Sequence, residues 1–147
     1  MGKHPRTIGT TLDALSRAEK QLARPLPKSL REWLLANNGL DLDAVHIYPV
    51  LDDRDARKTW DSIVRNFQVG WQAGLENFAG EREKFKSLLP FADFGTGDYY
   101  CFDYARLGAN GEPPVVLWSH ETGEVQPRGE SFADFKSRLL RREFAHD

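Results

Sequence analysis

Short apolar runs alternate with turn signals in the second half of the chain, and this pattern most constrains the fold. The runs cover residues 88–94, 99–104 and 115–118, and a weaker one lies near Val125. Glycine-containing turns separate them: Gly95-Thr96-Gly97-Asp98, Asn110-Gly111 and Thr122-Gly123. Such a series is typical of consecutive antiparallel strands. We therefore predict an antiparallel sheet here.

Helices are predicted on both sides of these strands. Thr10 or Thr11 can cap a first amphipathic helix, and a second is predicted from about Ser29 to a left-handed cap at Asn38-Gly39. Ser131 can cap a last helix that faces the sheet. The fold class predicted is α+β, a mainly antiparallel sheet packed by two N-terminal helices, a helical insert and a C-terminal helix.

The helical insert is predicted in residues 52–86, after a short strand that ends near Pro49. Its apolar residues form a helical stripe over about five turns. Gly70 and Gly74 each cost about 1 kcal/mol inside a helix, so we expect a break or bend there. The sequence leaves open whether the insert is one long helix or two short ones.

Length and cysteine content point to one domain in a reducing compartment. The chain has 147 residues, 40% of them hydrophobic, which suits a single domain over residues 1–147. Its one cysteine, Cys101, cannot form an internal disulfide. No run reaches the ~18 apolar residues of a membrane helix, and no signal peptide follows Met1. We expect a cytoplasmic location.

Charge is unevenly distributed along the chain. Residues 1–35 contain seven basic side chains against three acidic ones. Residues 87–127 contain six acidic side chains against Arg106 alone: Asp93, Asp98, Asp103, Glu112, Glu121 and Glu124. The imbalance is either averaged out in three dimensions or gathered into an acidic face that attracts a basic partner.

The residue types of enzyme and metal sites are present but poorly arranged for chemistry. The four histidines are scattered, and Ser119-His120-Glu121 are sequence neighbours that cannot readily line up as a triad. Cys101 lies in a strand among aromatic residues, as a buried thiol would. We therefore predict no catalytic residues, no metal and no cofactor. Direct nucleic-acid binding is also not expected, because the strand aromatics lie among acids.

Strand parity predicts that Tyr99, Cys101 and Asp103 share one face of the sheet, while Tyr100 and Phe102 share the other. Asp103 is then either a partly buried carboxylate that bonds a neighbouring turn or part of a binding site.

An ordered set of short motifs carries a family resemblance. The set runs over about residues 12–140 and comprises Leu26-Pro27, Leu30-Arg31, Asn38-Gly39, Ile47-Tyr48-Pro49, Leu89-Pro90-Phe91-Ala92, Gly97-Asp98, Cys101-Phe102-Asp103, Pro114-Val115-Val116, Trp118 with Glu121, and Ser131-Phe132 with Phe135. It resembles the SUKH superfamily, in particular the branch named for the yeast cell-wall regulator. The resemblance implies an α+β fold without catalytic residues. It further implies, in bacteria, a common role as an immunity protein encoded beside a polymorphic toxin, often a nuclease or deaminase.

Two functions follow as hypotheses. In the first, the chain neutralises a cognate toxin, plausibly a basic nuclease from the adjacent gene, through an acidic face. The residues expected to contact the toxin are Asp52, Asp53, Asp93, Asp98, Tyr99, Asp103 and Glu121. In the second, the chain is a regulatory or scaffold module for an endogenous protein, as in eukaryotic members of the superfamily.

Overall fold

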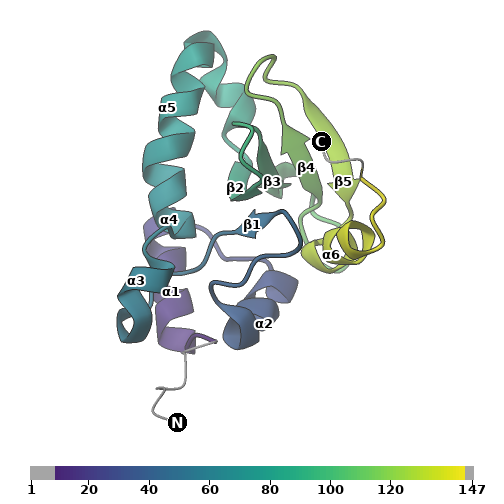
Figure 1. Cartoon of the computed structure of the whole chain (residues 1–147). Helices are drawn as coiled ribbons and strands as arrows, with labels where there is room; N and C mark the ends of the chain where they lie inside the picture. Colours follow the sequence, from purple (N-terminus) through teal and green to yellow (C-terminus); the bar gives the residue numbers. More distant parts are fainter. Residues whose placement is uncertain (1–8, 145–147) are drawn as a thin grey trace.

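The computed structural model describes residues 9–144 and contains the predicted antiparallel sheet (Figure 1). Its strands are β1 (His46–Ile47), β2 (Leu88–Asp93), β3 (Tyr99–Asp103), β4 (Val115–Trp118) and β5 (Val125–Gly129). They lie in the order β1-β2-β3-β4-β5, and each pairs antiparallel with its neighbour. The α+β prediction is confirmed.

Helices α1 (Leu12–Leu22), α2 (Lys28–Asn37) and α6 (Phe132–Leu140) contribute to the core on one face of the sheet. Thr11 caps α1 by accepting a hydrogen bond from the Ala14 amide. Ser131 caps α6 in the same way, as predicted. The buried side chains of this layer include Leu15, Leu22, Leu30, Leu34, Phe91, Tyr100, Phe102, Phe132 and Phe135.

Helix α2 is capped from a distant part of the chain. Pro27 precedes it and offers no side-chain cap. The Glu112 carboxylate instead accepts from the Ser29 amide at 2.9 Å and from its hydroxyl at 2.8 Å. A carboxylate at a helix N-terminus satisfies a free amide and complements the helix dipole. Glu112 is therefore buried inside the fold rather than presented on a surface.

The helical insert covers the other face of the sheet and appears in Figure 1 as a long column beside it. Short turns η1 (Asp53–Asp55) and α3 (Ala56–Thr59) precede its main run. The main run consists of α4 (Ile63–Arg65), the π-helical η2 (Asn66–Trp71), α5 (Gln72–Leu75) and the 3-10 segment η3 (Glu76–Phe85). None of the helices in residues 9–144 is long and apolar enough to span a membrane.

The expected break at Gly70 and Gly74 is wrong, because the chain stays helical through both glycines. Non-helical dihedral angles occur later, at Phe78 (φ −130°, ψ 40°) and Glu81. Gly70 instead allows the insert to approach the sheet closely, whereas Gly74 leaves room for a Cβ at ordinary contact distance. A Cβ at position 70 would lie 2.9 Å from the Tyr99 hydroxyl, and one at position 74 would lie 3.7 Å from the Trp118 ring.

A second core forms where the insert meets the sheet. Trp71 contacts the rings of Tyr99 and Trp118 edge-on, with centroids 5.5 Å and 4.8 Å away. Cys101 is fully buried in this core, as its sequence context indicates, and burial raises the pKa of its thiol. The predicted parity of β3 is confirmed, because Tyr100 and Phe102 belong to the opposite core.

The register places one row of residues across the sheet. His46 pairs with Asp93, Asp93 with Tyr99, and Tyr99 with Trp118. Directly paired residues of antiparallel strands project from the same face. The row thus runs from the aromatic core under the insert to charged side chains at the β1 edge.

Candidate partner-binding surface

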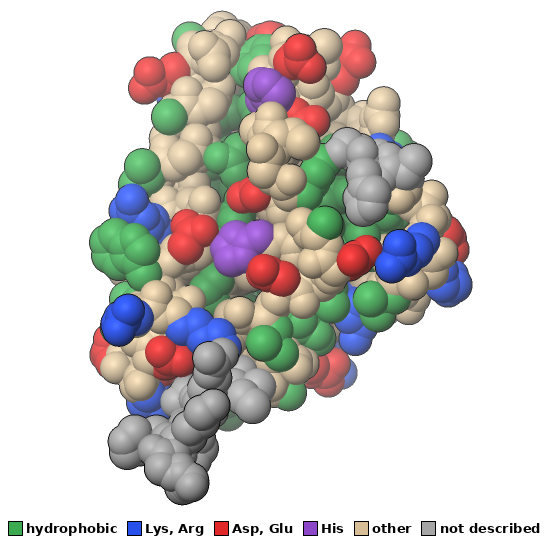
Figure 2. Space-filling view, viewed as in Figure 1, with side chains coloured by type: hydrophobic (Ala, Val, Ile, Leu, Met, Phe, Trp, Pro, Cys, Tyr) green, Lys and Arg blue, Asp and Glu red, His purple; other side chains and the backbone are tan. Residues whose placement is uncertain are grey.

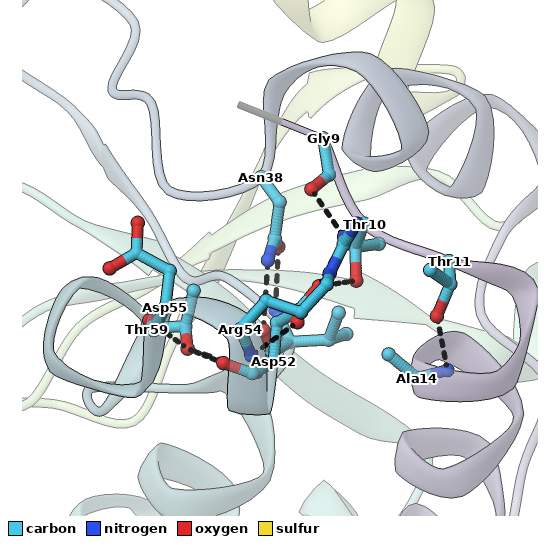
Figure 3. A network of polar contacts seen from close by, with 10 residues as sticks. Gly9, Thr10, Thr11, Ala14, Asn38, Asp52, Arg54, Asp55 and Thr59 are labelled. Carbon is cyan, nitrogen blue, oxygen red and sulfur yellow. Dashed lines mark hydrogen bonds and ion pairs between the residues drawn. The ribbon is translucent and has the colours of Figure 1, made fainter. Parts of the chain in front are cut away.

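Asp52 holds elements of the fold together and offers little surface to a partner. It is 3% exposed. Its carboxylate accepts hydrogen bonds from the Thr10 hydroxyl at 2.8 Å and from Arg54, whose Nη2 lies 2.7 Å away (Figure 3). The hydrogen bond from Arg54, with lesser contributions from its backbone amide and Thr10, holds the pKa of Asp52 well below its usual range despite burial. This network ties the segment before α1 to the start of the insert.

Asp103 is buried, whereas Asp53 is exposed. Asp103 is 8% exposed, accepts from the Ser87 hydroxyl and the Ala105 amide, and begins the turn η4 (Tyr104–Arg106). It is thus the satisfied, partly buried carboxylate of the first interpretation above. Asp53 is exposed and lines a groove beside α1. Because Asp52 and Asp103 are engaged within the fold, we leave both out of the proposed contact surface.

Asp93 on β2 and Tyr99 on β3 are cross-strand partners, and β2 lies beside the edge strand β1. The Tyr48 hydroxyl donates to the Asp93 carboxylate, which also accepts from the Gly95 amide at 3.1 Å. Burial raises the pKa of Tyr48 far above its ordinary value, and Asp93 and Asp61 add to the effect. The pKa of Tyr99 is raised by burial and then by Asp93, Cys101 and Asp61. Asp61 and Asp93 therefore act on the same pair of tyrosines.

Asp98 joins two turns at the neighbouring end of the sheet. One of its oxygens accepts from the His120 amide at 2.9 Å and contacts Nδ1 of the same residue. This links the β2–β3 turn to the β4–β5 turn. Glu121 follows His120 and is exposed, with its amide donating to the Ser119 hydroxyl. Glu121 thus lies on the β4–β5 turn, next to the histidine that Asp98 contacts.

His46 lies at the centre of an acidic cluster that the sequence analysis missed. Its Nδ1 is 2.7 Å from Asp41 Oδ1, and its Nε2 is 3.1 Å from Asp61 Oδ2. Burial lowers the pKa of His46, but the hydrogen bonds and charges of Asp41 and Asp61 outweigh it and raise that pKa above 6.5. A neutral imidazole has one N–H donor, whereas two carboxylates face this ring. The arrangement therefore favours the imidazolium.

The same geometry does not suit a metal ion. The two ring nitrogens of His46 point in opposite directions, so Asp41 and Asp61 do not converge with one nitrogen on a common point. No group of three or more histidine, cysteine or acidic side chains in residues 9–144 is arranged to hold a metal ion.

We call Asp41, Asp61, Asp93 and Asp98 the acidic edge. Figure 2 shows acidic side chains beside both histidines on the face that carries β1 and the upper turns. Asp41 and Asp61 each have side chains 53% exposed, so they are open to a partner. The sequence does show an acid on each side of His46, Asp41 before it and Asp61 after it. They lie outside the acidic window 87–127, which is why they were not singled out.

The fold and this edge define a class: an α+β domain whose antiparallel sheet lies between two helical layers and carries charged and aromatic side chains at one edge. Residues 9–138 match the SMI1 / KNR4 family (SUKH-1), and the chain belongs to this family. The match confirms the resemblance that the sequence motifs carry. A comparison with curated proteins finds no match.

Proposed function

We propose that this protein is an immunity protein that binds and neutralises a cognate toxin through the acidic edge. The observation that carries the proposal has two parts: Asp41 and Asp61 both contact His46, and Asp93 pairs with Tyr99 across β2 and β3, next to Asp98. Asp61 is also close enough to Tyr99 to act on its pKa. Membership of a SUKH family supports it, because immunity is a common role in that superfamily.

A basic nuclease is the toxin class that this edge suits best. A nuclease needs a basic surface to hold the phosphate backbone of its substrate. An acidic inhibitor can occupy that surface and gains fast association by electrostatic steering. The half-buried Tyr99 adds an aromatic contact of the kind that anchors protein interfaces. The protein would act in the cytoplasm, where the toxin would reach nucleic acid.

Co-expression tests this proposal most simply. The reading frame next to this gene is induced in a host with and without this protein, and survival is counted. We expect the neighbour to kill alone, survival to return with this protein, and the two proteins to co-purify. A neighbour that is harmless alone, together with recovery of only endogenous housekeeping proteins from the native host, would favour the regulatory or scaffold function and contradict immunity.

A further inference from the structure

A groove of about 600 Å³ runs between α1 and the insert. One wall is a face of α1 with the i, i+3, i+4, i+7 spacing of Ala14, Arg17, Ala18 and Gln21. The other wall comes from the beginning of the insert and carries Val64, Arg65, Gln68 and Val69. Two helical faces thus form a trough whose floor includes the small side chains of α1.

Large apolar side chains are exposed along this groove. Trp60 is 61% exposed, Val69 54% and Leu51 47%. Apolar side chains that gather at a hollow, rather than singly, mark an interaction site. Tryptophan is also among the residues that most often dominate the binding energy of an interface.

Basic side chains surround this apolar lining. Arg17, Lys20 and Arg65 line the groove against one acid, Asp53. The Arg65 guanidinium lies over the Trp60 ring, 4.6 Å from its centroid. Within residues 9–144, neither Arg17 nor Lys20 forms an ion pair with another side chain. In Figure 2, blue and green side chains lie together on the side of the molecule that carries α3 and α4.

We propose that this groove binds an acidic amphipathic helix of a protein partner. The basic side chains of the groove favour acidic residues on that helix, because their charges are complementary. The exposed Trp60, Val69 and Leu51 favour an apolar face on the same helix. The part of α1 that lines the groove runs from Ala14 to Gln21, which at 1.5 Å per residue gives a trough of about 12 Å, so about two turns of the bound helix fit along it.

The groove and the acidic edge require partners of opposite charge. Trp60 lines the groove, whereas the next residue, Asp61, contacts His46 at the acidic edge. A single turn therefore separates the two surfaces. The groove proposal goes beyond the immunity function and does not depend on it, because a basic toxin surface does not match the groove's basic side chains.

A phage library of random 16-residue peptides tests the proposal without assuming a sequence. The library is selected on the full chain, and retained peptides are then measured by fluorescence anisotropy against Trp60→Ala, Arg17→Glu and the control Lys86→Glu. Trp60 and Lys86 are exposed, so circular dichroism melting should remain close to wild type for both variants. We expect peptides rich in Asp and Glu with apolar residues at helical spacing, and affinity at least about tenfold weaker for Trp60→Ala and Arg17→Glu.

Three outcomes would overturn the proposal. Basic peptides that depend on Trp60 would contradict the charge assignment. Peptides whose affinity is unchanged by both groove substitutions would show that they bind elsewhere. Self-association in analytical ultracentrifugation that Trp60→Ala abolishes would place a second copy of this chain in the groove instead of an acidic helix.

Discussion

The Nε2 atom of His46 lies 3.1 Å from Oδ2 of Asp61. This contact joins the edge strand β1 to the start of the insert's main run, because Asp61 directly precedes Ser62, the N-cap of α4. Asp41 approaches the opposite ring nitrogen, so the imidazole bridges two acids from separate segments. His46 thus holds Asp41 and Asp61 of the acidic edge together, and the charge of a histidine depends on pH near neutrality.

Replacing His46 by Gln should change how stability depends on pH. The pKa of His46 is raised in the folded protein, so its protonated form is stabilised there. This contribution is fully present below pH 6.5 and is lost as the pH rises through the folded pKa. We expect the difference in free energy of unfolding between wild type and His46→Gln to shrink from pH 5.5 to pH 8.5 in urea titrations. A pH-independent difference would contradict this.

Asp52 and Asp53 form a matched pair of neighbouring acids. Asp52→Asn leaves Arg54 and Thr10 without their buried acceptor charge, so we expect a loss of about 2 kcal/mol in free energy of unfolding. Asp53→Asn, at an exposed position, should change it by less than about 0.5 kcal/mol. Because the pKa of Asp52 is lowered, the stabilisation is present above its unfolded pKa of 3.8 and is lost as pH falls through the folded value. Equal effects of the two substitutions in chemical denaturation would refute the network's role.

The two glycines of the insert should respond differently to alanine. Gly74→Ala meets Trp118 at ordinary contact distance, so we expect a gain of up to about 1 kcal/mol from helix propensity. Gly70→Ala meets the hydroxyl of Tyr99, whose ring packs against Trp71, and should be about 1 to 2 kcal/mol less stable than Gly74→Ala. In a Tyr99→Phe background the clashing oxygen is absent and Gly70→Ala should recover. Thermal melts of the variants would decide, and a Gly70→Ala protein as stable as Gly74→Ala would be inconsistent with the close approach.

The thiol of Cys101 should be unreactive in the folded protein. It is fully buried, and burial raises its pKa well above the ordinary value, so little thiolate is available. We expect Ellman's reagent to react slowly with native protein and within seconds in denaturant. Rapid reaction under native conditions would mean that the core around Trp71 opens readily.

Sequence patterns predicted the sheet and the flanking helices because each depends on local signals. Apolar runs between glycine turns located β2 to β4, and Thr11 and Ser131 cap helices as their residue types favour. The glycines of the insert were misread because propensity favours a break at Gly70, whereas tertiary packing needs the missing side chain there. This close contact is between residues 70 and 99, which are distant in the sequence, so no local sequence pattern predicts it.

The site was less predictable than the fold. The acidic window singled out Asp93, Asp98 and Tyr99, and the structure pairs Asp93 with Tyr99 across β2 and β3. Asp52, Asp103 and Glu112 are also acidic, but they are buried. Their burial depends on hydrogen-bond partners that are distant in the sequence, such as Thr10 for Asp52 and Ser29 for Glu112. Asp41 and Asp61 are brought together only by the fold, through His46.

The central claim is that the acidic edge steers and binds a basic toxin, and the association rate constant tests it most directly. Stopped-flow mixing with the neighbour-encoded toxin is compared for wild type, Asp41→Lys/Asp61→Lys and the control Glu32→Lys/Glu83→Lys, whose substituted residues are exposed and lie outside the edge. Circular dichroism checks that each variant is folded, and Asp41→Asn/Asp61→Asn provides a milder change of charge. We predict that the edge variant associates at least about tenfold more slowly at low salt and with a weaker dependence on ionic strength. Equal rate constants for the edge variant, the control and wild type would contradict the claim.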